Sequence, residues 1–95
     1  ERKKLQIEIE VRNLEELNEV LEIGQVDRIL LDNFDYSSLR KAVEMVGGKF
    51  LTEASGGINP ENVLEYAQCG VDYVSMGALT HSVRSLDMSL KAIVE

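Results

Sequence analysis

Several features that commonly define a protein class are scarce in this chain. Cys69 is the only cysteine, which excludes an internal disulfide, and we expect a reducing, cytoplasmic setting. Lysine and arginine number 10 against 17 aspartates and glutamates, and the formal net charge of −7 argues against nucleic acid or an anionic membrane as a partner. No uncharged apolar run approaches the roughly 20 residues of a membrane-spanning helix, so the sequence predicts no membrane segment.

What remains is the composition of an ordinary globular domain. Hydrophobic residues make up 44% and charged residues 28% of the 95 positions, a balance that excludes both disorder and a fibrous repeat. A chain of this length buries only about 60 to 65% of the surface that it exposes when unfolded. We therefore expect one compact unit that is marginally stable by itself.

A strand followed by a helix recurs along the chain. Period-2 alternation or a short apolar run predicts strands, and apolar residues at helical spacing between a capping residue and a glycine predict helices. The predicted strands are 6–11, 28–32, 50–54 and 73–76. The first predicted helix starts at Asn13, the second carries an apolar stripe from Leu39 onward, and the third starts at Asn59-Pro60. Asp87 is predicted to cap a last short helix. This order predicts an α/β fold of four parallel βα units forming part of a TIM-like (βα) barrel.

Polar or glycine positions recur at the carboxyl ends of the four predicted strands. Glu10, Asp32, Ser55 and Gly77 are separated by 22, 23 and 22 residues. In a (βα) barrel this end is the rim where catalytic groups lie, so the recurrence predicts a site. The plain alternative is that βα loops are simply polar, but Asp32 closes an apolar run, where a surface role alone does not favour a carboxylate.

Alternation places further carboxylates on the same inward face as these four positions. Glu8 and Glu53 are two residues away from Glu10 and Ser55, and Arg28 is the only cation with the same parity. Buried carboxylates are costly unless they are paired. We therefore expect basic groups from outside these 95 residues, or from another subunit, to meet this acidic face.

The segment from Ser55 to Pro60 is the most informative about a ligand. Gly56 and Gly57 allow the backbone to approach a ligand closely, and a helix beginning at Asn59-Pro60 would point its positive end at the same place. Gly77 follows the next strand, and two consecutive loops of this kind suit a phosphate. Each glycine motif alone is weak, since Gly56-Gly57 also suits a simple turn.

Four side chains are candidates whose roles the residues leave open. Glu10 and Asp32 suit ribose hydroxyls, or Mg²⁺ beside a substrate diphosphate, although a buried ion-pair network is a serious competing interpretation. His81 is the sole histidine and is either a phosphate ligand or an exposed loop residue. Cys69 has no histidine near it in the sequence, so an unreactive thiol is favoured over a nucleophile.

The chain resembles the C-terminal half of quinolinate phosphoribosyltransferase, also called nicotinate-nucleotide pyrophosphorylase (carboxylating). The resemblance rests on the runs IEIEV (7–11), LDNF (31–34), EASGGI (53–58), VSMGALTH (74–81) and LD (86–87). It implies transfer of phosphoribose from phosphoribosyl pyrophosphate to quinolinate, giving nicotinate mononucleotide, CO₂ and pyrophosphate for NAD biosynthesis. It also implies Mg²⁺, bound with the phosphoribosyl pyrophosphate, and a homodimer.

The resemblance also implies roles for seven residues. Glu10 and Asp32 would be catalytic and would contact the ribose, and the 5′-phosphate would be held by Ser55, Gly56, Gly57, Gly77 and His81. The family's N-terminal domain and earlier barrel strands, which carry basic residues for quinolinate and pyrophosphate, are not found in residues 1–95. We therefore expect the chain to be a C-terminal portion of the barrel domain that is inactive alone. The alternatives are a non-catalytic phosphate-binding half-barrel that self-associates, or a relative that uses another acceptor.

Overall fold

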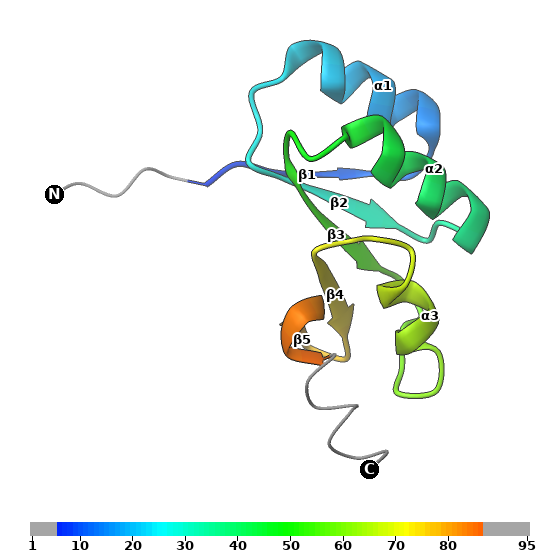
Figure 1. The fold of residues 1–95 in the computed structure, drawn as a ribbon. Coiled ribbons are helices and arrows are strands. Elements are labelled where there is room, and N and C mark those ends of the chain that lie inside the picture. Colours follow the sequence, from blue (N-terminus) through cyan, green and yellow to red (C-terminus); the bar gives the residue numbers. More distant parts are fainter. Residues whose placement is uncertain (1–5, 87–95) are drawn as a thin grey trace, which may run out of the picture.

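Four parallel strands and one antiparallel strand form a single sheet in the computed structural model, which describes residues 6–86 (Figure 1). The sheet order is β1-β2-β3-β4-β5, and only the β4–β5 pair is antiparallel. The strands are β1 (Glu8–Val11), β2 (Arg28–Asp32), β3 (Leu51–Ser55), β4 (Tyr73–Met76) and β5 (Leu79–Ser82). The helices are α1 (Leu14–Ile23), α2 (Tyr36–Val46) and α3 (Val63–Ala67). The four predicted parallel strands are thus confirmed.

The helices pack against one face of the sheet, because alternate strand residues on that face are apolar. In Figure 1, α1 and α2 lie side by side over β1 and β2, and α3 lies beside β4. The core combines strand residues with helix residues: Val11, Ile29, Leu31, Ala54 and Val74 from the strands, and Leu17, Val20, Leu39, Ala42 and Val46 from the helices. Ile7 and Ile9, which alternation places on the same face as Val11, are 51% and 37% exposed, because β1 is an edge strand. The other face of the sheet carries the polar residues.

The ends of the two long helices are set by short polar side chains and glycine. The Asn13 side chain accepts a hydrogen bond from the backbone N–H of Glu16 at 2.8 Å, and Gly24 ends α1 in the left-handed conformation at φ 71°. Both ends of α1 agree with the prediction. The Asp35 carboxylate caps α2 by accepting from Ser38 N–H at 2.7 Å, and this bond lowers the pKa of Asp35.

Helix α3 is shorter than predicted. The sequence predicts a start at Asn59-Pro60, but the structure has a turn there and the helix begins at Val63. The Asn59 side chain accepts from the backbone N–H groups of Glu61 at 2.9 Å and Asn62 at 3.1 Å. The Val63 N–H also donates to the Asn59 carbonyl at 2.9 Å. Asn59 therefore caps a turn that leads into α3, and the regular helix begins later than predicted.

Strand β5 replaces the loop that the sequence predicts after Gly77. Gly77 and Ala78 form a two-residue turn, with Met76 paired to Leu79 across the hairpin. Gly77 has φ 66°, a conformation that two-residue hairpin turns need and glycine adopts without strain. Residues 83–86 are helical, and the predicted helix capped by Asp87 lies outside the described residues.

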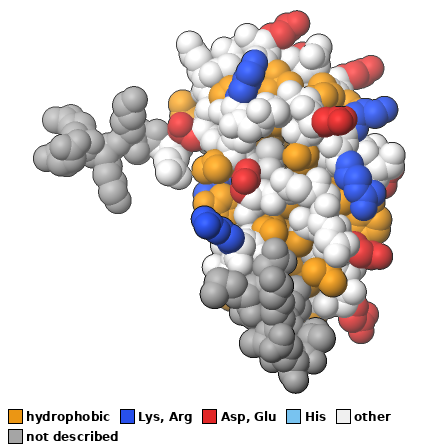
Figure 2. All heavy atoms as spheres, in the orientation of Figure 1, with side chains coloured by type: hydrophobic (Ala, Val, Ile, Leu, Met, Phe, Trp, Pro, Cys, Tyr) orange, Lys and Arg blue, Asp and Glu red, His pale blue; other side chains and the backbone are white. Residues whose placement is uncertain are grey.

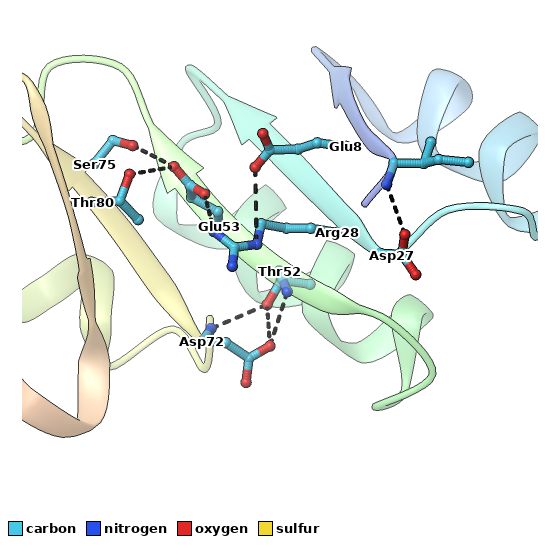
Figure 3. A network of polar contacts seen from close by, with 9 residues as sticks. Glu8, Asp27, Arg28, Thr52, Glu53, Asp72, Ser75 and Thr80 are labelled. Atoms are coloured by element: carbon cyan, nitrogen blue, oxygen red, sulfur yellow. Dashed lines mark hydrogen bonds and ion pairs between the residues drawn. The ribbon is translucent and has the colours of Figure 1, made fainter. Parts of the chain in front are cut away.

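Two aspartates tie the amino-terminal ends of the strands together (Figure 3). Asp27 accepts a hydrogen bond from the N–H of Ile7 at 2.7 Å, which holds the entry to β1 against β2. Asp72 accepts from the N–H and hydroxyl of Thr52 at 2.9 and 3.2 Å. These contacts give both aspartates a structural role at this end of the sheet.

A tyrosine–carboxylate hydrogen bond joins α2 to α3. The Tyr36 hydroxyl donates to Glu65 at 2.8 Å, and its ring lies edge-on to Tyr66 with centroids 4.9 Å apart. The hydrogen bond to a carboxylate favours the protonated phenol, and it raises the pKa of Tyr36 from 10.0 to about 12.

We expect Glu65→Gln to move the pKa of Tyr36 back toward 10, because the charged acceptor is lost. Tyrosinate absorbance followed against pH measures this shift, with Tyr36→Phe identifying the signal. Since the folded pKa lies above the unfolded one, the contribution of Tyr36 to stability is full below pH 10 and is lost as the pH rises to about 12. The free energy of unfolding should fall less steeply in that window for Tyr36→Phe, and an equal slope in both proteins would contradict the assignment.

Candidate functional site

Of the four rim positions, Asp32 and Ser55 pair directly, whereas Glu10 and Gly77 are each offset by two residues from the neighbouring rim position. The pairs that set the registers are Glu10 with Leu30, Asp32 with Ser55, and Ala54 with Val74. Asp32 therefore lies two residues beyond the partner of Glu10, Ser55 is itself the partner of Asp32, and Gly77 lies two residues beyond the position level with Ser55. From β1 to β4 the rim positions thus advance by two residues, none and two residues. In a closed barrel with strands tilted by about 36° and a shear of about 8 over roughly eight strands, residues at one height advance about one residue per strand. The advance therefore places the four positions along one mouth of a barrel wall.

The carboxyl ends of β2 and β3 are locked together at this mouth. The Ser55 hydroxyl donates to Asp32 at 2.9 Å, and the Asn33 N–H donates to the Ser55 carbonyl at 2.9 Å. Asn33 has φ 61°, a left-handed conformation that asparagine tolerates better than most residues. A Cβ at Gly56 would lie 2.6 Å from the Asn33 side-chain oxygen, so the two loops touch where only glycine fits. Sequence reasoning missed Asn33, although an asparagine directly after a strand-ending aspartate is a typical turn signal.

The remainder of the glycine loop is arranged differently from the prediction. Gly57 has φ 71°, and a Cβ there would meet no heavy atom within 4 Å. The Gly57 carbonyl accepts from the Asn62 side chain at 3.0 Å, which ties the loop to the turn before α3. Helix α3 begins only at Val63 and has five residues, so the helix that was predicted to point its amino terminus at a phosphate does not start at Asn59-Pro60. The backbone of the loop is what remains to meet a ligand.

Glu10 lies on the edge strand with part of its side chain exposed to solvent. Its carboxylate is 3.8 Å from the guanidinium of Arg12, and both side chains are substantially exposed, so solvent screens the pair. Sequence reasoning did not single out Arg12, which follows β1 directly. A hollow of about 450 Å³ lies beside it, between the loops that lead into α1 and α2 and lined in part by Asn13 and Asn33. Arg12 thus places one cation beside a predicted ribose-binding carboxylate.

His81 is not brought together with the other candidates. It lies in β5, not in a loop, and pairs with Val74 on β4. Paired residues on antiparallel strands share a face, and Val74 is buried on the helix-covered face. The phosphate contact expected of His81 therefore finds no support in this arrangement. Its neighbour Thr80 points to the polar face instead.

A buried carboxylate organises the polar face (Figure 3). Glu53 is 4% exposed, and it accepts from Arg28 at 3.0 Å, from the Ser75 hydroxyl, and from the Thr80 hydroxyl at 3.4 Å. Arg28 also lies 3.9 Å from Glu8. The expectation that cations from elsewhere must meet this acidic face is wrong for Glu53, because Arg28 of the same chain neutralises it. Sequence reasoning could not find Thr80, since its strand was not predicted.

Cys69 has the surroundings of an inert thiol. It is buried, and its sulfur lies 3.4 Å from the carbonyl of Glu65 and 3.8 Å from that of Tyr36. Burial raises the pKa of the Cys69 thiol, which disfavours the reactive thiolate. This agrees with the interpretation drawn from the sequence.

Neither a metal-binding cluster nor a membrane-spanning helix is found among the described residues. Residues 6–86 contain no group of three or more histidine, cysteine, aspartate or glutamate side chains arranged to hold a metal ion. None of the helices formed by these residues is both long and apolar enough to cross a bilayer.

We expect Gly56→Ala to destabilise the chain more than Gly57→Ala. Both substitutions place a side chain in the left-handed region at a cost of about 1–2 kcal/mol, but only a Cβ at position 56 collides with Asn33. Displacing that loop should cost about 1–3 kcal/mol more. Urea unfolding of the two variants measures the difference, and equal losses would show that the contact with Asn33 is not tight.

Comparison with known proteins identifies the family. The family description "Quinolinate phosphoribosyl transferase, C-terminal domain" matches residues 1–91. Quinolinate phosphoribosyltransferase [decarboxylating] 2, mitochondrial, of Nicotiana glauca is 47% identical over 111 residues, covering 100% of this chain and 32% of the relative. A probable nicotinate-nucleotide pyrophosphorylase [carboxylating] of Methanocaldococcus jannaschii is 48% identical over 94 residues, covering 92% of this chain and 33% of the relative.

Solved structures agree with the sequence comparison. The nicotinate-nucleotide pyrophosphorylase of Ehrlichia chaffeensis superimposes with a TM-score of 0.71 at 44% identity, over 78% of this chain and 27% of that one. The enzyme of the same name from Francisella tularensis gives a TM-score of 0.70 at 35% identity, over 79% and 28%. The chain spans about a third of the length of the curated relatives that it matches. The chain belongs to the quinolinate phosphoribosyltransferase family.

Proposed function

We propose that this chain forms the ribose 5-phosphate side of the active site of a quinolinate phosphoribosyltransferase. The reaction joins quinolinate to the phosphoribosyl group of phosphoribosyl pyrophosphate and yields nicotinate mononucleotide, CO₂ and pyrophosphate. The observation that carries the proposal is the locked unit at the mouth of β2 and β3, in which Ser55 holds Asp32 and the Gly56 loop rests on Asn33. Family membership of the chain supports the same assignment.

The phosphate is assigned to the backbone of two glycine turns. Gly56, Gly57 and Gly77 all have positive φ, and a Cβ at Gly57 or Gly77 would meet nothing within 4 Å. Ser55 has a single hydroxyl proton, which it donates to Asp32. Its side chain can therefore orient Asp32, or after rotation donate to the phosphate, but it cannot do both at once.

The two carboxylates are assigned to the reacting ribose. As the bond between ribose C1 and the diphosphate oxygen breaks, positive charge develops at C1, and a preorganised carboxylate stabilises that charge. Asp32 is held in place for this task by the hydrogen bond from Ser55. Glu10 lies on the adjacent strand and pairs with Leu30, two residues before Asp32. Either carboxylate can also accept hydrogen bonds from ribose hydroxyls.

Mg²⁺ belongs to the proposal as an ion that arrives with phosphoribosyl pyrophosphate. Carboxylate oxygens such as those of Asp32 and Glu10 are the hard ligands that Mg²⁺ accepts, and the ion is commonly held by one or two carboxylates together with substrate phosphates. When bound, it would neutralise charge on the leaving diphosphate. The arrangement of residues 6–86, which offer no cluster of three such ligands, suits this shared mode of binding.

Assembly, other partners and location stay predictions. The face shown in Figure 2 carries basic and acidic side chains interspersed with apolar ones. The absence of nucleic acid and of an anionic membrane as partners is proposed from the net charge of −7. The homodimer is proposed from the resemblance alone. A cytoplasmic location is proposed from the single cysteine, whereas plant relatives bear names that place them in mitochondria or chloroplasts.

A graft into a solved relative tests the proposed function. We expect the Ehrlichia chaffeensis enzyme to keep activity when its matching segment is replaced by this chain, with nicotinate mononucleotide formation as the assay. Asp32→Asn in the graft should lower kcat by roughly 10²-fold. Asp27→Asn is the matched control, because it makes the same change at the opposite end of β2. A stable graft that binds phosphoribosyl pyrophosphate but forms no product would favour a non-catalytic phosphate-binding half-barrel.

The 95-residue chain alone should form no detectable nicotinate mononucleotide. The physical reason is that pyrophosphate and quinolinate are polyanions, and the described residues offer only Arg12 as a cation at the mouth. Product formation by the purified chain would overturn this prediction. Gel filtration of the same sample reports whether it self-associates, as the half-barrel alternative requires.

A further inference from the structure

The hairpin that carries Gly77 is held from both of its strands by one carboxylate oxygen. Ser75 on β4 and Thr80 on β5 are directly paired, and they flank the turn formed by Gly77 and Ala78. Both hydroxyls donate to Oε2 of Glu53 on β3, the Thr80 hydroxyl at 3.4 Å. Figure 3 shows the two side chains converging on that oxygen. One atom of the neighbouring strand thus bridges the two strands just below the turn.

The other carboxylate oxygen of Glu53 is also occupied. Oε1 accepts from Nη1 of Arg28 on β2 at 3.0 Å. The Arg28 guanidinium in turn lies 4.0 Å above the ring of Tyr73 and 3.9 Å from the Glu8 carboxylate. Glu53 is 4% exposed, so its charge depends on these partners and not on water. A single buried group therefore couples β2, β3, β4 and β5.

We propose that Glu53 and Thr80 are positioning residues that set the Gly77 turn at the distance from the Gly56 loop that a bound phosphate requires. The inference rests on the proposed function, in which both turns contact the same 5′-phosphate. Backbone pairing joins the hairpin to β3 only through Tyr73 and Val74, so the part of the hairpin beyond Val74 can tilt as a unit relative to β3. The Thr80–Glu53 bond restricts this tilt, because it ties the outer strand to a group two strands away.

A carboxylate suits position 53 because one oxygen faces a guanidinium and the other faces two hydroxyl groups. In Glu53→Gln the amide oxygen could still accept from Arg28 and the amide nitrogen could donate to the hydroxyl oxygens, so the hydrogen bonds could reverse direction. The variant also removes the negative charge that faces Arg28, so its effects would be mixed, and Thr80 offers the sharper test.

The test compares Thr80→Val, which keeps the shape and removes the hydroxyl, with Thr80→Ser, which keeps the hydroxyl. In the graft described above, Thr80→Val should raise KM for phosphoribosyl pyrophosphate about five- to tenfold. We expect kcat within about twofold of the parent and an unchanged KM for quinolinate, because only phosphate positioning is affected. Thr80→Ser should restore the KM of the parent graft.

Thr52→Val is the matched control for a purely structural threonine. The Thr52 hydroxyl also bonds to a carboxylate, that of Asp72, but at the opposite end of the sheet. Its loss should lower stability without changing KM for phosphoribosyl pyrophosphate. A KM shift of the same size in Thr52→Val and Thr80→Val would overturn the inference, because the shift would then report stability alone.

A second readout does not depend on the proposed function. In the 95-residue chain without ligand, hydrogen exchange of the backbone N–H groups in residues 73–82 should be faster for Thr80→Val than for Thr80→Ser. Equal exchange rates and equal KM values would overturn the inference. If the parent graft fails to bind phosphoribosyl pyrophosphate, the proposed function fails and the inference falls with it. If the parent binds and Thr80→Val matches it, only the positioning role is lost.

Discussion

The buried carboxylate of Glu53 is the constraint on which the polar face of this sheet depends. A charge that is 4% exposed is tolerated only where donors surround it, and here the donors come from β2, β4 and β5. Because Arg28 neutralises Glu53 within the sheet, its charge is not available to a ligand at the mouth. The mouth consequently contains Asp32, Glu10 with Arg12 beside it, and glycine turns whose backbone is free to meet a phosphate.

The rim follows from the register of the strands. The rim positions of β1 to β4 are not level with one another in the sheet: from strand to strand they advance by two residues, none and two residues. This advance fits the tilted strands of a barrel wall. The same geometry brings Asp32 level with Ser55, so that a hydroxyl on one strand orients a carboxylate on the next. Asn33 and Gly56 then hold the two following loops in contact.

Sequence patterns predicted those features that depend on local alternation or on a single capping residue. The four parallel strands and the ends of α1 are of this kind. The start of α3 was wrong because Asn59 closes a turn with its own neighbours, an outcome that its capping signal does not distinguish from a helix. β5 was missed because Leu79–Ser82 has only one apolar residue, so its pairing with β4 carries no period-2 signal. The Glu53 contacts depend on how β3 is aligned with β2, β4 and β5, and the pattern within one segment does not encode that alignment.

The distribution of cations explains why this chain suits one part of a phosphoribosyl transfer and not the whole. A ribose hydroxyl is bound well by a carboxylate, and a single phosphate is bound well by backbone N–H groups at glycine turns. Diphosphate and a dicarboxylate acceptor need several guanidinium or ammonium groups, yet Arg28 is committed to Glu53 and Arg12 is the cation near Glu10. Under the proposed function, the chemistry of these residues therefore fits the ribose 5-phosphate half of the substrate, and we expect groups outside the described residues to bind its anionic partners.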